Sequence, residues 1–339
     1  DGGGSGNVIT LNADGITIEG FTVRNLGSWP NAGINVVSNA NKIACNSITN
    51  NRYGIFLWDS NNNKIYNNTA SNNDYGICLG YSSNNNIIAN STVSSNNVDG
   101  IYLHSSSNNT IANNNANSNN HDGIYLYSSS NNNKIYNNNA SNNEDGIHLG
   151  SSSNNTIYNN IANSNNEWGI FLAYSSNNTI YNNTASNNYN EDGIHLGSSS
   201  NNTIYNNIAN SNNEDGIYLG DSSNNTIYNN TVSSNNWDGI FLYSSSSNNI
   251  YNNTANSNNE DGIALWFSSN NSITNNVMNS DGIVIGGSQL QHWNTHTIEG
   301  DIVNDKPLYY FKNKIGGEVP EDAGQVILAN CTGMRIENL

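Results

Sequence analysis

The chain has 339 residues, a formal net charge of −17 and only 9 Lys and Arg residues. A nucleic-acid binder needs a basic patch to collect phosphates, so the composition excludes that class, and the same acidity argues against docking on an anionic membrane leaflet. No apolar stretch is long enough to predict a transmembrane helix. The sequence shows no initiator Met and no signal-peptide pattern, which predicts a processed or partial product.

Asparagine dominates the composition, with 83 of the 339 residues. Asn is a poor helix former and a good turn former, while 35% of the chain is still hydrophobic. These features predict a repetitive β-structure with polar turns rather than disorder. Cys45, Cys78 and Cys331 are far apart and form no CxxC pair, so we expect three buried thiols and no zinc or redox motif.

The dipeptide Gly-Ile recurs from Gly54 to Gly262 at intervals that average about 23 residues. One unit cannot bury its two or three apolar residues alone, so successive coils must stack about 4.8 Å apart, each strand pairing with its neighbours. The period therefore predicts an all-β fold, a single-stranded right-handed parallel β-helix (solenoid) with three short strands per roughly 23-residue coil.

The unit DGIYLYSSSNNNKIYNNNASNNE, which begins at residue 122, shows the predicted placement of side chains. Ile124 and Leu126 alternate with outward residues, which is the two-residue period of a strand. Ile135 and Ala140 are the inward residues of the second and third strands. Asn residues two positions after the inward Ile are expected to stack as an amide ladder: Asn137, Asn159, Asn182, Asn206, Asn229 and Asn252.

The regular pattern ends near residue 287. We expect parallel β-helix repeats over residues 1–287, an insertion or capping segment over 288–324, and a further β-helix coil over 325–339.

Units such as NNTIYNNIANSNNEDGIYLG (residues 201–220) resemble the repeats of NosD-like proteins and of related carbohydrate-binding or sugar-hydrolase β-helix modules. The opening segment 1–25 resembles the first coils of such proteins, and segment 304–339 is similar to the C-terminal part of NosD-like proteins, often found on archaeal surfaces. The resemblance implies the fold and leaves enzymes, adhesins and scaffolds open as functions. NosD itself is associated with copper delivery, which requires soft ligands, yet the 2 Met, 3 Cys and 6 His here are scattered.

Carboxylates recur immediately before the repeat glycines and form a predicted column. Like charges about 5 Å apart would raise one another's pKa or attract Ca²⁺, although an Asp-Gly turn with glycine at positive φ explains the pattern without a ligand. The column is too uniform for a catalytic pair, so we expect no catalytic residues. The column includes Asp99, Asp122, Asp145, Asp192, Asp215, Asp238, Asp261 and Asp281, and the possible calcium ligands among them are Asp192, Asp215, Asp238 and Asp261.

Aromatic residues occupy the outward positions of the first strand. They stack well within a sheet, and if exposed they could form a platform for sugar rings or an interface for another copy. The candidates for carbohydrate or partner binding are Trp58, Tyr102, Tyr125, Tyr127, Phe171, Tyr218, Phe241, Tyr243 and Trp266.

His148 and His195 are expected at the surface, too far apart for a shared metal ion. Asn-x-Ser/Thr sequons fit a secreted glycoprotein. The possible glycosylation sites are Asn67, Asn90, Asn154, Asn201, Asn252 and Asn330.

Three functional hypotheses follow from these features. The first is a non-catalytic extracellular or cell-surface structural protein, such as an envelope, sheath, filament or adhesion component, that self-associates end to end or laterally. The second is a polysaccharide-binding, lyase- or hydrolase-related protein that uses the aromatic residues. A copper-related periplasmic role is a third, and no cofactor other than possible Ca²⁺ is expected.

Overall fold

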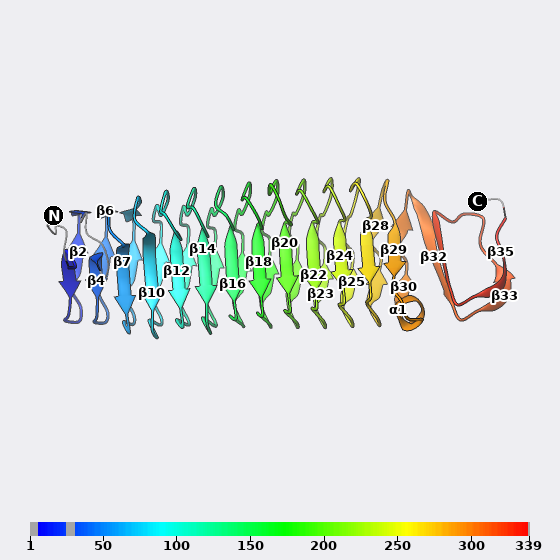
Figure 1. Ribbon diagram of the computed structural model, residues 1–339, viewed down its shortest axis with the longest axis horizontal. Helices are drawn as coiled ribbons and strands as arrows, with labels where there is room; N and C mark the ends of the chain where they lie inside the picture. Colours follow the sequence, from blue (N-terminus) through cyan, green and yellow to red (C-terminus); the bar gives the residue numbers. More distant parts are fainter. Residues whose placement is uncertain (1–5, 25–30, 338–339) are drawn as a thin grey trace. The chain divides into compact units, whose positions relative to one another are not determined.

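The computed structural model describes residues 6–24 and 31–337, so parts of the opening segment 1–25 and of the last expected coil lie outside the described residues (Figure 1). The chain divides into two compact units, Asp1–Thr179 and Ile180–Leu339. Apart from one antiparallel pair near the end of unit 2, the short strands of each unit pair in parallel with strands of the preceding and following coils, which confirms the all-β parallel β-helix.

The first strands of the coils form sheet A and the second strands form sheet B. In unit 1, sheet A contains β1 (Ile9–Leu11), β4 (Ala32–Val36), β7 (Tyr53–Trp58), β10 (Tyr75–Gly80), β12 (Ile101–His104), β14 (Ile124–Tyr127), β16 (Ile147–Gly150) and β18 (Ile170–Ala173). Sheet B of unit 1 contains β2 (Thr17–Glu19), β5 (Lys42–Ala44), β8 (Lys64–Tyr66), β11 (Ile87–Ala89), β13 (Thr110–Ala112), β15 (Lys134–Tyr136) and β17 (Thr156–Tyr158).

Unit 2 repeats this arrangement. Its sheet A contains β20 (Ile194–Gly197), β22 (Ile217–Gly220), β24 (Ile240–Tyr243), β26 (Ile263–Trp266) and β29 (Ile283–Gly286). Its sheet B contains β21 (Thr203–Tyr205), β23 (Thr226–Tyr228), β25 (Asn249–Tyr251), β27 (Ser272–Thr274) and β30 (Thr297–Glu299), and β19 (Thr179–Tyr181) spans the boundary between the units.

The third strand of a coil is the weakest. It is a regular strand in β3 (Thr22–Arg24), β6 (Ser47–Thr49), β9 (Thr69–Ala70), β28 (Val277–Met278) and β31 (Ile302–Val303). In coils between these, the third strand is reduced to single bridges such as Thr231↔Thr254. The third inward position is nevertheless buried as expected, because Ala140 and Val232 are fully inaccessible.

The core consists of columns of identical apolar residues. In unit 2, Ile217 pairs with Ile240 and Leu219 with Leu242, and all four side chains are completely buried. Because the pairing keeps register, most inward Ile and Leu residues of sheets A and B meet a residue of their own kind in the neighbouring coils, with exceptions at the ends such as Leu11↔Val36 and Leu265↔Ile285. Burying such a side chain stabilises the fold by roughly 1.5–3 kcal/mol.

The repeat glycines have a different role from the one expected. We predicted turns with positive φ, but Gly100, Gly123 and Gly239 are absent from the residues with positive φ. A Cβ atom at Gly123 would lie 2.8 Å from the carbonyl oxygen of Gly146, so the close approach of the next coil requires glycine here. The positive φ values occur at Asn and Ser corners instead.

The amide ladder is present, but one residue later than predicted. Asn206 has a φ of 54° and points outward, whereas the next residue, Asn207, is fully buried. Asn207 donates from Nδ2 to Oδ1 of Asn230 at 3.0 Å, and Asn230 donates in the same way to Asn253 at 3.0 Å. A left-handed corner turns one side chain out and the following one in, so the ladder contains the second Asn of each pair.

The segment after β29 closes the sheets of unit 2. It contains α1 (Gln291–Asn294), β32 (Lys306–Lys312), β33 (Ile315–Glu318), β34 (Gln325–Ala329) and β35 (Thr332–Arg335). Within the expected insertion 288–324, β30 and β31 still pair in parallel with β27 and β28, and β32 then pairs with β34. The proposed domain boundaries stay a prediction.

Gln325 covers the last strand of sheet A. Its side-chain Oε1 accepts a hydrogen bond from the Ile283 N–H, and its Nε2 donates to the Ile283 carbonyl, both at 2.8 Å. One side chain therefore replaces the backbone of a further coil. No helix in the described part of the chain has the length and apolar character required to cross a membrane.

Candidate functional site

The outward side of sheet A carries aromatic side chains, and we call this surface the aromatic face. All nine predicted residues lie there, because they alternate with buried Ile and Leu on their strands. Rings in neighbouring coils contact one another: the centroids of Tyr102 and Tyr125 are 5.4 Å apart in unit 1, and those of Tyr218 and Phe241 are 5.5 Å apart in unit 2. The aromatic face is thus a packed surface in each unit.

Part of the aromatic face is accessible to a ligand. Trp58 and Tyr127 in unit 1 are 45% and 42% exposed, and Tyr243 and Trp266 in unit 2 are 42% and 43% exposed. Large aromatic side chains left this open in rows are uncommon unless they bind a partner or ligand.

A cleft hollows the aromatic face of unit 1 beside β10, and we call it the Gly80 cleft. It has a volume of about 410 Å³. Cys78 and Gly80 take the outward positions of β10, where the neighbouring strands β7 and β12 carry Phe56, Trp58 and Tyr102. Small residues between bulky ones leave a hollow with aromatic walls. The cleft is lined by Arg52, Tyr53, Phe56, Trp58, Cys78, Gly80, Tyr81, Tyr102 and His104.

Sequence reasoning missed Tyr53, Tyr75 and Tyr81. Tyr53 and Tyr75 precede Gly54 and Gly76, at the position where later coils carry Asp, and their rings stack with centroids 5.3 Å apart. The replacement of Asp by Tyr at these two positions is visible in the sequence and could have indicated a local change in the aromatic face. Tyr81 comes from the turn after β10, has a φ of 53°, and stacks on Trp58 at 3.9 Å between centroids.

Two polar groups belong to the lining of the Gly80 cleft. The guanidinium of Arg52 lies over the ring of Tyr53, 5.0 Å from its centroid. His104 Nδ1 is buried and has no hydrogen-bond partner among the described residues. A buried polar atom without a partner costs about 1–3 kcal/mol, which a ligand hydroxyl reached by a side-chain rotation would offset.

The predicted carboxylate column is present and forms a hydrogen-bonded ladder. The main-chain N–H of Asp122 donates to Asp99 Oδ1 at 3.2 Å, and in unit 2 the Asp238 N–H donates to Asp215 Oδ1 at 2.8 Å. Asp99 and Asp215 therefore accept from the following coil, whereas a ladder Asn such as Asn230 accepts from the preceding coil.

Burial perturbs the acidity of this column. Burial, followed by the charge of Asp122, raises the pKa of Asp99 to about 7, and burial raises the pKa of Asp122 and of Asp145 to about 8. In unit 2, burial raises the pKa of Asp238 to about 7 and that of Asp215 well above its usual value. The column thus carries less negative charge at neutral pH than its composition suggests.

The histidines are less exposed than we predicted. The His148 and His195 side chains are each only 18% exposed, because both turn towards buried carboxylates. His148 Nδ1 lies 3.1 Å from Asp122 Oδ2 and 3.5 Å from Asp145 Oδ2, and burial lowers the pKa of His148. His195 Nδ1 lies 2.8 Å from Asp192 Oδ2.

Among the described residues, the one group of three metal-ligating side chains drawn together is Asp122, Asp145 and His148, whose ligand atoms lie within 4.8 Å of one another. It differs from the set expected to bind Ca²⁺, which lies in unit 2; calcium binding there stays a prediction. One imidazole and two carboxylates without sulfur lack the soft ligands that Cu(I) prefers. Of the cysteines, only Cys78 is buried; Cys45 is exposed at a corner with a φ of 55°, which corrects the expectation of three buried thiols.

The six predicted glycosylation sites are all exposed corner residues with positive φ. Their side chains are accessible to solvent, as attachment of a glycan requires. Occupancy stays a prediction.

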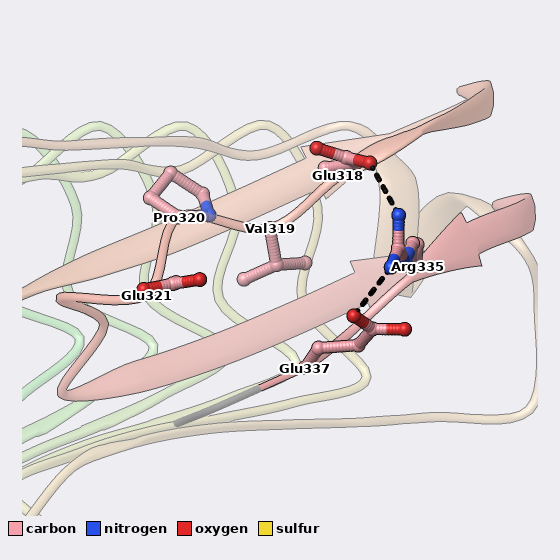
Figure 2. Close-up of a pocket in the computed structure, with 6 residues that line it drawn as sticks. All are labelled: Glu318, Val319, Pro320, Glu321, Arg335 and Glu337. Atoms are coloured by element: carbon pink, nitrogen blue, oxygen red, sulfur yellow. Dashed lines mark hydrogen bonds and ion pairs between the residues drawn. The ribbon is translucent and has the colours of Figure 1, made fainter.

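A further pocket of about 390 Å³ lies near β33 and β35 in unit 2 (Figure 2). Figure 2 shows Arg335 between two carboxylates, 3.0 Å from Glu318 and 2.6 Å from Glu337. All three side chains are more than half exposed, so these ion pairs are weak. Since the arginine already has acidic partners, the pocket has little to offer an anionic ligand.

Two protein-family models match the chain. Residues 3–168 match the model described as periplasmic copper-binding protein (NosD), and residues 131–278 and 190–338 match the model described as right handed beta helix region. The chain therefore belongs to the right-handed β-helix family, and its first half is NosD-like, which confirms the resemblance and the handedness. No curated protein sequence matches the chain.

Solved structures support the same fold. A mutant of the periplasmic alginate epimerase AlgG has a TM-score of 0.58 and 16% identity, covering 87% of this chain and 76% of its own. The Azotobacter vinelandii mannuronan C-5 epimerase AlgE6 A-module has a TM-score of 0.51 and 15% identity, covering 97% and 89%. The Dettilon tailspike protein has a TM-score of 0.50 and 16% identity, covering 87% and 61%. At such identities these likenesses show the fold alone.

Proposed function

We propose that this chain is an extracellular or cell-surface β-helix protein that binds polysaccharide on its aromatic face. The observation that carries the proposal is the set of exposed rings on the aromatic face, which are Trp58 and Tyr127 in unit 1 and the neighbouring Tyr243 and Trp266 in unit 2. The face of an aromatic ring is electron-rich, so it attracts the weakly positive C–H groups on the flat side of a sugar ring. Related folds include enzymes named for alginate and mannuronan, which supports a polysaccharide as the ligand.

The proposal is non-catalytic. A binding surface needs repeated equivalent contacts along a polymer, which the coils supply, and the Asp ladder is used for main-chain hydrogen bonds between coils. The sequons on exposed corners fit a secreted glycoprotein. The periplasmic description of NosD supports a location outside the cytoplasm.

A glycan array tests the proposal, with the double variant Trp58→Ala/Tyr127→Ala compared against Trp237→Ala/Tyr189→Ala. The second pair removes a Trp that is 44% exposed and a Tyr that is 61% exposed, both outside the aromatic face. Binding to at least one polysaccharide, lost in the first variant and kept in the second, is expected. Absence of binding to any glycan would overturn the proposal.

Self-association is a second proposal. Gln325 already covers the last strand of sheet A, so a second copy would contact this one side by side, through the exposed rings of the aromatic face such as Tyr243 and Trp266. Electron microscopy at high concentration should show filaments or bundles, and particles that remain monomeric would refute it.

A further inference from the structure

The Gly80 cleft differs from other glycine positions on the aromatic face. A Cβ atom at Gly150 would lie 3.0 Å from the ring of Tyr127, and one at Gly220 would lie 2.8 Å from the ring of Tyr218. At those positions a neighbouring ring has filled the space that the missing side chain leaves. At Gly80 the nearest atom, in the ring of Phe56, is 3.5 Å away, so the space stays open.

The lining of this cleft suits a sugar ring. Its volume of about 410 Å³ falls within the range of small-ligand sites, and its walls are aromatic. Arg52 provides guanidinium N–H donors for hydroxyl groups, and a rotation of the His104 side chain would present its buried Nδ1, which has no partner among the described residues. Apolar walls with a few convergent polar groups match the two faces of a pyranose, flat C–H surfaces and a rim of hydroxyls.

The charges around the cleft favour an uncharged ligand. Arg52 is the one cationic side chain that lines it, and the carboxylates of Asp74 and Asp99 lie close enough to act on the neighbouring tyrosines. The chain has a formal net charge of −17 and stays acidic even where the buried Asp residues are protonated, so a polyanion lying along the face would be repelled at low ionic strength.

We propose that the Gly80 cleft binds one sugar ring of an uncharged polysaccharide and that it dominates the affinity of the aromatic face. This inference rests on the proposed polysaccharide-binding function. The flat remainder of the face then makes weaker contacts with the rest of the polymer, because its rings are packed against one another and offer one side each.

The test is to fill the cleft in the full chain. Gly80→Phe adds a ring where a Cβ atom meets only ordinary van der Waals contacts, and Gly80 has no positive φ, so the variant should keep its melting temperature. Tyr81→Ala opens a wall instead, at a side chain that is 52% exposed. Trp237→Ala is the control outside the cleft. Calorimetric titrations would use soluble β-glucan, mannan and xylan as neutral probes, with alginate and polygalacturonate as polyanionic probes.

We expect a neutral probe to bind more tightly than either polyanion in low salt. Gly80→Phe and Tyr81→Ala should each weaken that binding at least about tenfold, while Trp237→Ala leaves it within about twofold. Tighter binding of a polyanion, or a folded Gly80→Phe variant that binds like the wild type, would overturn the inference and leave the proposed function standing. Failure of all five probes and of the glycan array would instead remove the proposed function itself.

Discussion

Removal of one ladder amide should destabilise unit 2 strongly. Asn207 is fully buried, and its Oδ1 accepts from the N–H and from Nδ2 of Asn183 at 2.9 and 3.0 Å. Its Nδ2 donates to the carbonyl oxygens of Ile180 and Tyr205 and to Asn230 Oδ1, at 3.0–3.1 Å. Asn207→Ala deletes these five hydrogen bonds at once.

The magnitude follows from the donors that lose their acceptor. Two donors of Asn183 are left without the oxygen they used, and each such loss in a buried site costs about 1–3 kcal/mol, which gives about 2–6 kcal/mol in all. Carbonyl oxygens tolerate the loss better, because their strand partners remain. The change is a large fraction of the roughly 5–15 kcal/mol that holds a typical domain together.

Urea denaturation followed by far-UV circular dichroism measures the change, and hydrogen exchange of the Asn183 amide locates it. Asn259→Ala is the matched control, because Asn259 is exposed and has no positive φ. The control should change stability by less than about 0.5 kcal/mol. If Asn207→Ala unfolds within that margin of the control, or the Asn183 amide exchanges no faster, the ladder contributes little and the reasoning is wrong.

Three other outcomes follow from the structure. Burial raises the pKa of Asp238 from 3.8 to about 7, so between these values the folded state holds a proton that the unfolded state has released. Melting temperatures should therefore fall between about pH 4 and pH 7 and level off above pH 7, less so in Asp238→Asn and as in the wild type in the exposed Asp221→Asn; a constant melting temperature from pH 4 to pH 7 would contradict this. Gln325→Ala removes the side chain that bonds the Ile283 backbone, which costs about 1–3 kcal/mol, and should speed hydrogen exchange of the Ile283 amide. The exposed control Gln291→Ala should leave that exchange rate unchanged, and equal rates in the two variants would argue against the cap. Ile227→Ala should cost about 2–5 kcal/mol and Ile227→Val about 0.5–1.5 kcal/mol in chemical denaturation, and similar losses would show a loosely packed core.

The repeat made the fold predictable. Alternation of Ile124 and Leu126 with outward Tyr residues fixes which side of the strand faces the core, and the constant spacing then aligns every coil. The aromatic face follows from the same alternation, so its nine residues could be placed without coordinates.

Features that depend on the backbone conformation within a coil were harder to predict from the sequence. The shift of the ladder from Asn206 to Asn207 depends on which of two adjacent Asn residues adopts the left-handed corner, and both are Asn. The Gly80 cleft depends on an absence of side chains between two neighbours and on Tyr81 folding back from a turn. The Gln325 cap joins residues 42 positions apart outside the repeat, where no periodicity guides the prediction.

The like-with-like pairing of the coils has a consequence for how such a chain can vary in length. If residues 217–239 were excised, Gly216 would be followed by Ile240, and each strand of the shortened molecule would still face a neighbour of the same sequence type. Loss or duplication of a whole coil should therefore leave the pattern of buried residues unchanged, whereas a deletion of half a coil would leave one coil whose strands cannot pair in register with both neighbours.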